Sequence, residues 1–125
     1  MIKLIPVLAL VAFGAVKSEP KPVLQSPRNF YRAGDTAEVS IVRDTAIDVA
    51  FCVVQQRATF FYTIEQLVRE GEWMTVYNTS AVCQANMASV MRAEKGFTIK
   101  HLMRDKGTFR VVVSNVYRSN EFEIR

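Results

Sequence analysis

The chain has 125 residues, a length typical of one domain. Half of its residues are hydrophobic and 22% are charged, which allows one core and excludes a disordered or collagen-like chain. The formal net charge is +4, but Lys3 and Lys17 lie in an apolar leader, which leaves fourteen basic against twelve acidic residues. Because this balance is close to neutral and the basic residues are scattered, we expect no nucleic-acid binding.

The first eighteen residues have the layout of a secretory signal peptide. Lys3 gives a positive start, an apolar run extends from Leu4 to Val16, and Val16-Lys17-Ser18 offers a cleavage site. This run is shorter than the roughly 20 apolar residues that a membrane-spanning helix needs. We expect residues 1–18 to be cleaved, and a retained amphipathic anchor is the alternative.

Removal of the leader would leave residues 19–125 as one exported domain. Its expected location is the extracellular space, the periplasm or the cell envelope, without a stable membrane span. Residues 19–28 contain three prolines and suit an edge strand or an extended lead-in.

Hydrophobic residues then alternate with a period of two, which predicts strands. The first two predicted strands are Thr36–Val42 and Ile47–Val54. Phe60–Val68 and Trp73–Tyr77 follow as a hairpin, in which Gly71 gives the turn its backbone freedom.

The last third of the chain continues this pattern. Residues 87–91 suit a strand or a helical turn, and strands are predicted at Phe97–Leu102 and Thr108–Val116. A turn at Arg118-Ser119-Asn120 leads into a final strand at residues 121–124.

Seven or eight short strands predict an all-β, antiparallel sandwich rather than a small barrel. Its two facing sheets should bury one set of side chains. The predicted core consists of Val39, Ile41, Val49, Phe51, Val111, Val113 and Phe122.

Cys52 and Cys83 are the two cysteines of the chain. An even number of cysteines in an oxidising compartment favours a disulfide, and two separate buried thiols are the alternative. The bridge would close a loop of roughly 30 residues and contribute about 3 kcal/mol in the chain-entropy description. Two cysteines and one histidine are too few for a zinc site, and we expect neither metal nor cofactor.

Several short motifs resemble the bacterial immunoglobulin-like domains of exported proteins. In that family a leucine-glutamate-x-leucine strand enters a glycine-glutamate-tryptophan hairpin, and a leucine-x-proline-glycine-x-tyrosine-arginine turn and strand come later. The motifs in this chain are Tyr62–Leu67, Gly71-Glu72-Trp73, Ala93–Ile99, Lys106–Arg110 and Ser119–Ile124.

The resemblance covers about 60 residues and has two departures. Asp105-Lys106-Gly107 stands where the family usually has proline-glycine, and Phe109 stands where it has tyrosine. Such domains serve as accessory, binding or spacer modules and have no catalytic residues. The resemblance therefore implies an immunoglobulin-like sandwich of this class and names no ligand. We expect the partner to be another protein or an envelope component.

Catalytic motifs are missing from the sequence. His101 is the one histidine, and no nucleophile elbow accompanies it, so a structural role is expected. The pairs Glu70/Glu72 and Glu121/Glu123 fit solvated charge better than acid–base catalysis. Asn78-Thr79-Ser80 matches the glycosylation acceptor pattern, with a chance match as the alternative.

The turn of the central hairpin is a candidate partner-binding loop, made of Arg69, Glu70, Glu72 and Trp73. Its tryptophan and the Phe60-Phe61-Tyr62 cluster could form an exposed patch, although such residues are more often core. Exposed strand edges offer a second route to a partner.

The leading functional hypothesis is an exported, non-enzymatic immunoglobulin-like module with a binding or structural role. The alternative is an inhibitor of an extracellular hydrolase that acts through a protruding loop, at residues 78–86 or 69–73. A small exported enzyme comes third.

Overall fold

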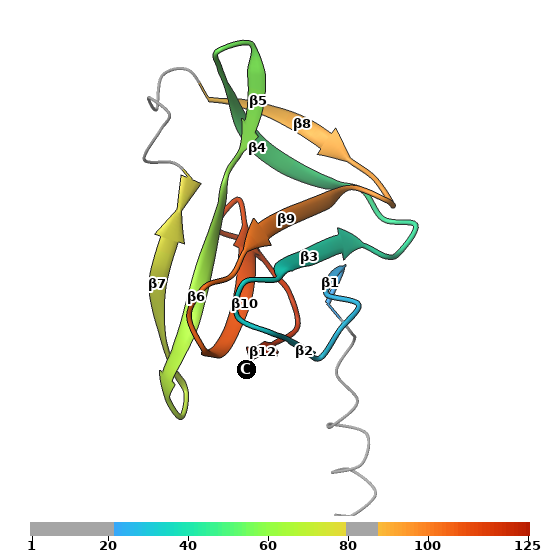
Figure 1. Ribbon diagram of the computed structural model, residues 1–125. Helices are drawn as coiled ribbons and strands as arrows, with labels where there is room; N and C mark the ends of the chain where they lie inside the picture. Colours follow the sequence, from blue (N-terminus) through green and yellow to red (C-terminus); the bar gives the residue numbers. More distant parts are fainter. Residues whose placement is uncertain (1–21, 80–87) are drawn as a thin grey trace, which may run out of the picture.

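The computed structural model describes residues 22–79 and 88–125 (Figure 1). This part of the chain consists of strands and turns, without an α-helix, and it confirms the all-β class. The strands are β1 (Leu24–Gln25), β2 (Phe30–Tyr31), β3 (Thr36–Ile41), β4 (Ile47–Val54), β5 (Arg57–Phe60), β6 (Tyr62–Arg69), β7 (Glu72–Asn78), β8 (Ser89–Ala93), β9 (Thr98–Leu102), β10 (Gly107–Val113), β11 (Tyr117–Arg118) and β12 (Phe122–Ile124).

These strands form three sheets. The largest has the order β2-β12-β10-β6-β7, with β11 also paired to β10, and the others are β1-β3-β9 and β5-β4-β8. Every pair of strands is antiparallel except β2 and β12, which run parallel. The structure has more strands than the seven or eight predicted because short pieces such as β1, β2 and β11 carry too few residues to show a period.

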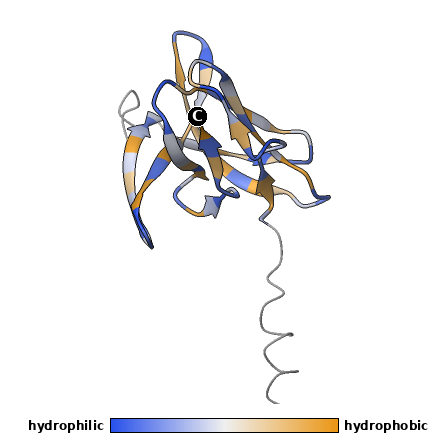
Figure 2. Cartoon of the chain, turned by 60° about the horizontal axis from the view of Figure 1, so that its bottom comes forward, coloured by the Kyte–Doolittle hydropathy of each residue, from blue (hydrophilic) through white to orange (hydrophobic). Residues whose placement is uncertain are grey.

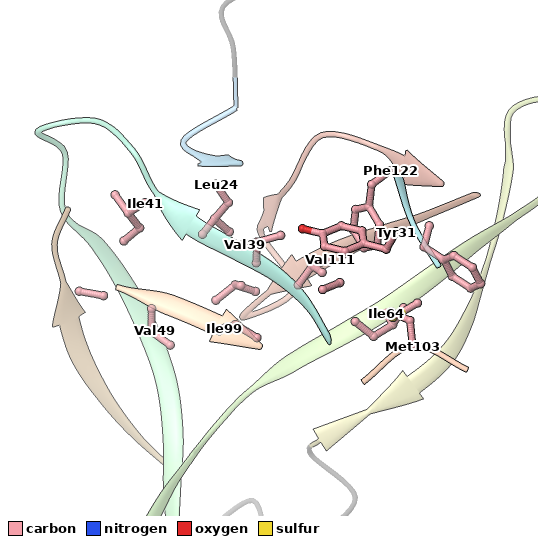
Figure 3. Close-up of a cluster of buried hydrophobic side chains, with 14 of the residues drawn as sticks. Leu24, Tyr31, Val39, Ile41, Val49, Ile64, Ile99, Met103, Val111 and Phe122 are labelled. Atoms are coloured by element: carbon pink, nitrogen blue, oxygen red, sulfur yellow. The ribbon is translucent and has the colours of Figure 1, made fainter. Parts of the chain in front are cut away.

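One hydrophobic core joins the three sheets in a sandwich-like arrangement (Figure 3). Figure 2 shows how hydrophobic and hydrophilic positions alternate along the strands. Burial of each large side chain contributes about 1.5–3 kcal/mol. Six of the seven predicted core side chains are at most 3% exposed, namely Val39, Ile41, Val49, Val111, Val113 and Phe122.

The prediction was wrong for the far end of β4. Phe51 is only half-buried and Val53 is 56% exposed, whereas Cys52 on the opposite face is buried. β4 pairs with β8 as far as Phe51 and pairs with β5 from Phe51 onward. The β4–β5 hairpin therefore projects beyond the core, as Figure 1 shows at the top of the molecule, and its inner face loses its cover.

The C-terminal turn also lies elsewhere than predicted. β10 ends at Val113, and the chain reverses at Ser114 and Asn115, which have φ angles of 54° and 61°. Two consecutive residues at positive φ match the right-handed twist of a tight hairpin. Ser119, expected in the turn, is buried, and its hydroxyl accepts a hydrogen bond from the Val111 amide at 2.9 Å.

The structure decides the open assignment after residue 87. Ser89–Ala93 is a strand that pairs with β4, not a helical turn. The predicted signal peptide, Cys83 and most of the loop at 78–86 lie outside the described residues. In the ranges that are described, we find no helix with the length and hydropathy required to cross a membrane.

Candidate binding site on the β6–β7 hairpin

The predicted central hairpin is confirmed as β6 and β7, joined by a turn in which Gly71 has a φ angle of 74°. β6 pairs with β10 on its other side, while β7 ends the sheet. Within residues 22–79 and 88–125, no strand pairs with the outer edge of β7. The hairpin therefore offers a tip, two faces and an edge to other molecules.

Three residues of the predicted partner-binding loop lie at the exposed tip. Arg69, Glu70 and Glu72 surround the turn, and Arg69 Nε lies 2.8 Å from Glu72 Oε2. Both side chains of this pair are solvent-exposed, so the pair contributes little to stability.

Trp73, the fourth predicted loop residue, belongs to the outer face of the sheet instead. The Arg110 guanidinium carbon lies 4.1 Å from its ring centroid, and Arg110 Nε lies 2.6 Å from Glu65 Oε1. This cluster covers much of each side chain and ties β7 to β10 across β6. Trp73 is thus half-buried and held in place by the sheet.

The inner face of the hairpin contains a β-bulge. Glu65 pairs with Thr75 and Ile64 pairs with Tyr77, so Val76 has no partner on β6. Val76 and Tyr77 consequently line the same depression. Met74 lies on this face too, because its partner on β6, Gln66, is also the partner of the buried Phe109.

This depression, the hairpin groove, has a volume of about 390 Å³. Ile64, Met103 and Phe109 form a buried apolar floor, and Figure 3 shows the first two side by side. Val76 and Tyr77 line it on β7, and residues from the end of β9 line it opposite. The charged side chains at its rim are Arg104 and Asp105.

Four large apolar side chains stand half-exposed around the hairpin groove. They are between 43% and 50% exposed, and three of them come from β7. Isolated exposed apolar residues are ordinary, but a contiguous set marks an interaction site. The four are Met74, Val76, Tyr77 and Leu102.

An aromatic cluster adjoins the groove, because Tyr77 and His101 line the groove and both contact Tyr62. The Tyr62 hydroxyl oxygen lies 2.9 Å from His101 Nδ1, and the Tyr77 ring centroid lies 4.4 Å from that of His101. Burial, followed by the neighbouring Tyr77, raises the pKa of Tyr62 to about 12, and burial lowers the pKa of His101 below its ordinary value. A protonated hydroxyl can therefore donate to the neutral imidazole.

The sequence could not reveal this cluster. Tyr62, Tyr77 and His101 come from three strands, and the bulge at Val76 sets the side to which Tyr77 points. His101 is half-buried.

The structure also describes parts of the predicted disulfide and of the glycosylation pattern. Cys52 is buried in β4, and its expected partner Cys83 lies outside the described residues, so the disulfide remains a prediction. Thr79 of the glycosylation pattern is buried and accepts a hydrogen bond from the Tyr62 amide at 2.8 Å. Among the residues that the structure describes, no three His, Cys, Asp or Glu side chains gather as metal ligands would.

The hairpin groove combines an apolar floor, half-exposed apolar walls and a charged rim, which suits the binding of another polypeptide. Comparisons of the chain with family models, with curated proteins and with solved structures found no match.

Proposed function

We propose that this chain is an exported, non-enzymatic immunoglobulin-like module that binds another polypeptide through the hairpin groove. The observation that carries the proposal is the gathering of Val76, Tyr77 and Leu102 around a buried apolar floor. The exposed Met74 lies beside them on the same face of β7. Contact with a partner would remove these side chains from water. Each Å² of apolar surface buried in this way contributes about 25 cal/mol to the free energy of binding.

The composition of the groove supports a protein partner. Tyrosine and arginine are enriched in protein interfaces, and both line the groove as Tyr77 and Arg104, while the exposed Met74 lies beside it on the same face of β7. Export is supported by the signal-like leader, and the immunoglobulin-like assignment by the sandwich-like arrangement together with the motifs between Tyr62 and Ile124.

The test uses the tagged domain, residues 19–125, as bait in secreted and envelope fractions. Leu102→Asp places a charge in the groove and should abolish capture of the bound polypeptide. Val116→Asp is the matched control, because Val116 is 65% exposed and lies outside the groove. The proposal is wrong if the Leu102→Asp domain still captures the polypeptide. It is also wrong if the domain shows an enzymatic activity that mutation of His101 abolishes.

Inhibition of an extracellular hydrolase remains a second candidate, favoured by the form of the hairpin tip. Figure 1 shows the β6–β7 hairpin extending past the neighbouring strands, and Arg69 and Glu72 are exposed there. If the tip blocks an enzyme, Arg69→Ala combined with Glu72→Ala should restore hydrolase activity, while Leu102→Asp should leave the inhibition unchanged.

A further inference from the structure

We infer that the polypeptide bound in the hairpin groove is a second copy of this chain, related to the first by a two-fold axis. This inference rests on the proposed function and adds the identity of the partner. It is carried by the charges at the rim and by the bulge in β7.

The rim of the groove is electrically self-complementary. Arg104 and Asp105 are consecutive, exposed and of opposite sign. Neither forms an ion pair within the described ranges. In a two-fold interface both copies use the same surface patch. If residue i of the first copy contacts residue j of the second, residue j of the first copy also contacts residue i of the second. Arg104 of each copy can thus meet Asp105 of the other.

The walls of the groove fit the same arrangement. Val76, Tyr77 and Leu102 in the walls and Met74 beside them are all uncharged, so two copies of this surface approach without repulsion between like charges. A partner suited to this rim carries one cationic and one anionic group beside an uncharged apolar surface, and a second copy of the chain supplies both.

The bulge explains why the contact closes as a dimer instead of extending a sheet. An edge strand can pair with another edge through its free amides and carbonyls. At Val76 the extra residue interrupts the regular ladder of β7. Association is then favoured through side chains on the inner face of the hairpin. Two copies related by a two-fold axis bury the groove surface of each against the other, so neither surface is free to bind a third copy.

The experiment measures self-association of the domain, residues 19–125, by sedimentation from micromolar to millimolar concentration. The wild-type domain should show a reversible monomer–dimer equilibrium. Arg104→Asp gives two acidic residues at the rim and Asp105→Arg gives two basic ones, so each variant alone should weaken the dimer by about tenfold or more.

Mixing the two variants is the decisive arm. Each Asp of the first variant then meets an Arg of the second, so an equimolar mixture should form a heterodimer at least as readily as the wild type. Arg57→Asp serves as the matched control, because Arg57 is exposed on β5 outside the groove.

The failures of the two proposals can be told apart. A domain that stays monomeric at every concentration, or a dimer unaffected by both single variants, overturns the second copy as partner. If Leu102→Asp still abolishes capture of a different protein in that case, the binding function stands. If Leu102→Asp changes neither dimerisation nor capture, both proposals are wrong.

Discussion

The guanidinium group of Arg110 stacks on the indole ring of Trp73, with 4.1 Å between the guanidinium carbon and the ring centroid. The two residues belong to β10 and β7, which do not pair with each other, because β6 lies between them. The same guanidinium binds Glu65 on β6, so one side chain joins three strands on the outer face of the sheet.

Arg110→Lys should keep the charge beside Glu65 but lose the planar stack on Trp73. We expect the free energy of unfolding to fall by about 0.5–2 kcal/mol, because the Arg110 side chain is 19% exposed and the contact lies between an exposed and a desolvated cation–π pair. Trp73 is the one tryptophan of the chain, so its fluorescence reports the site, and its emission should shift to longer wavelength. The same substitution at the exposed Arg118 should change neither quantity.

Two valines on β4 give a matched test of the core. Val49 is fully buried, whereas Val53 is 56% exposed on the projecting hairpin. Val49→Ala removes two buried carbons and leaves a cavity, which should cost about 2–3 kcal/mol. Val53→Ala should stay within about 0.5 kcal/mol of wild type in urea unfolding. Equal losses at both positions would contradict the placement of this strand.

The turn between β4 and β5 stores backbone strain. Gln55 and Gln56 have φ angles of 51° and 67°, in the left-handed region that favours glycine. Gln56→Gly should therefore raise the free energy of unfolding by about 1 kcal/mol. Gln56→Ala removes the same side-chain amide but keeps the Cβ atom, so it should not stabilise. Thermal unfolding of the two variants separates backbone strain from side-chain effects.

Stability should depend on the protonation of His101. Burial lowers the pKa of His101 below 6.5, its ordinary value, so between the two values the unfolded chain binds more protons than the folded one. The contribution of His101 to the free energy of unfolding is therefore fully present above pH 6.5. It falls as the pH drops from 6.5 toward the pKa of His101 in the folded state, and below that pKa it stays constant.

His101→Gln tests this dependence, because glutamine does not titrate yet can still accept a hydrogen bond from Tyr62. We expect the urea midpoint of the wild type to decrease more than that of the variant between about pH 7.5 and 5.5. Parallel curves for the two proteins would show that the histidine does not contribute.

The expected bridge between Cys52 and Cys83 can be tested by counting thiols in denatured protein without reductant. We expect none in the wild type, and reduction should lower the free energy of unfolding by about 3 kcal/mol. Cys83→Ser should show one thiol and no further loss on reduction. Two reactive thiols in the wild type would favour separate buried cysteines.

Local patterns were sufficient for the strands that lie over the core. The alternation in Thr36–Val42 and Ile47–Val54 located β3 and β4, and Gly71 located the turn of the central hairpin. These features depend on neighbouring residues only, since side chains alternate between faces in any extended strand.

The same patterns failed where burial depends on distant strands. Phe51 and Val53 continue the apolar alternation of β4, yet this end of β4 lies beyond the core. Trp73 was expected at a loop tip and instead stacks on Arg110, which follows it by 37 positions in the chain.

The sequence by itself determined the all-β class, most strand positions and most of the core, because a period of two is a local property of the chain. Tertiary structure alone decided which strand became the exposed edge, where the bulge at Val76 fell, and how Tyr77 came to lie beside His101. These features follow from strand order and register, which are set by packing between residues far apart in the chain.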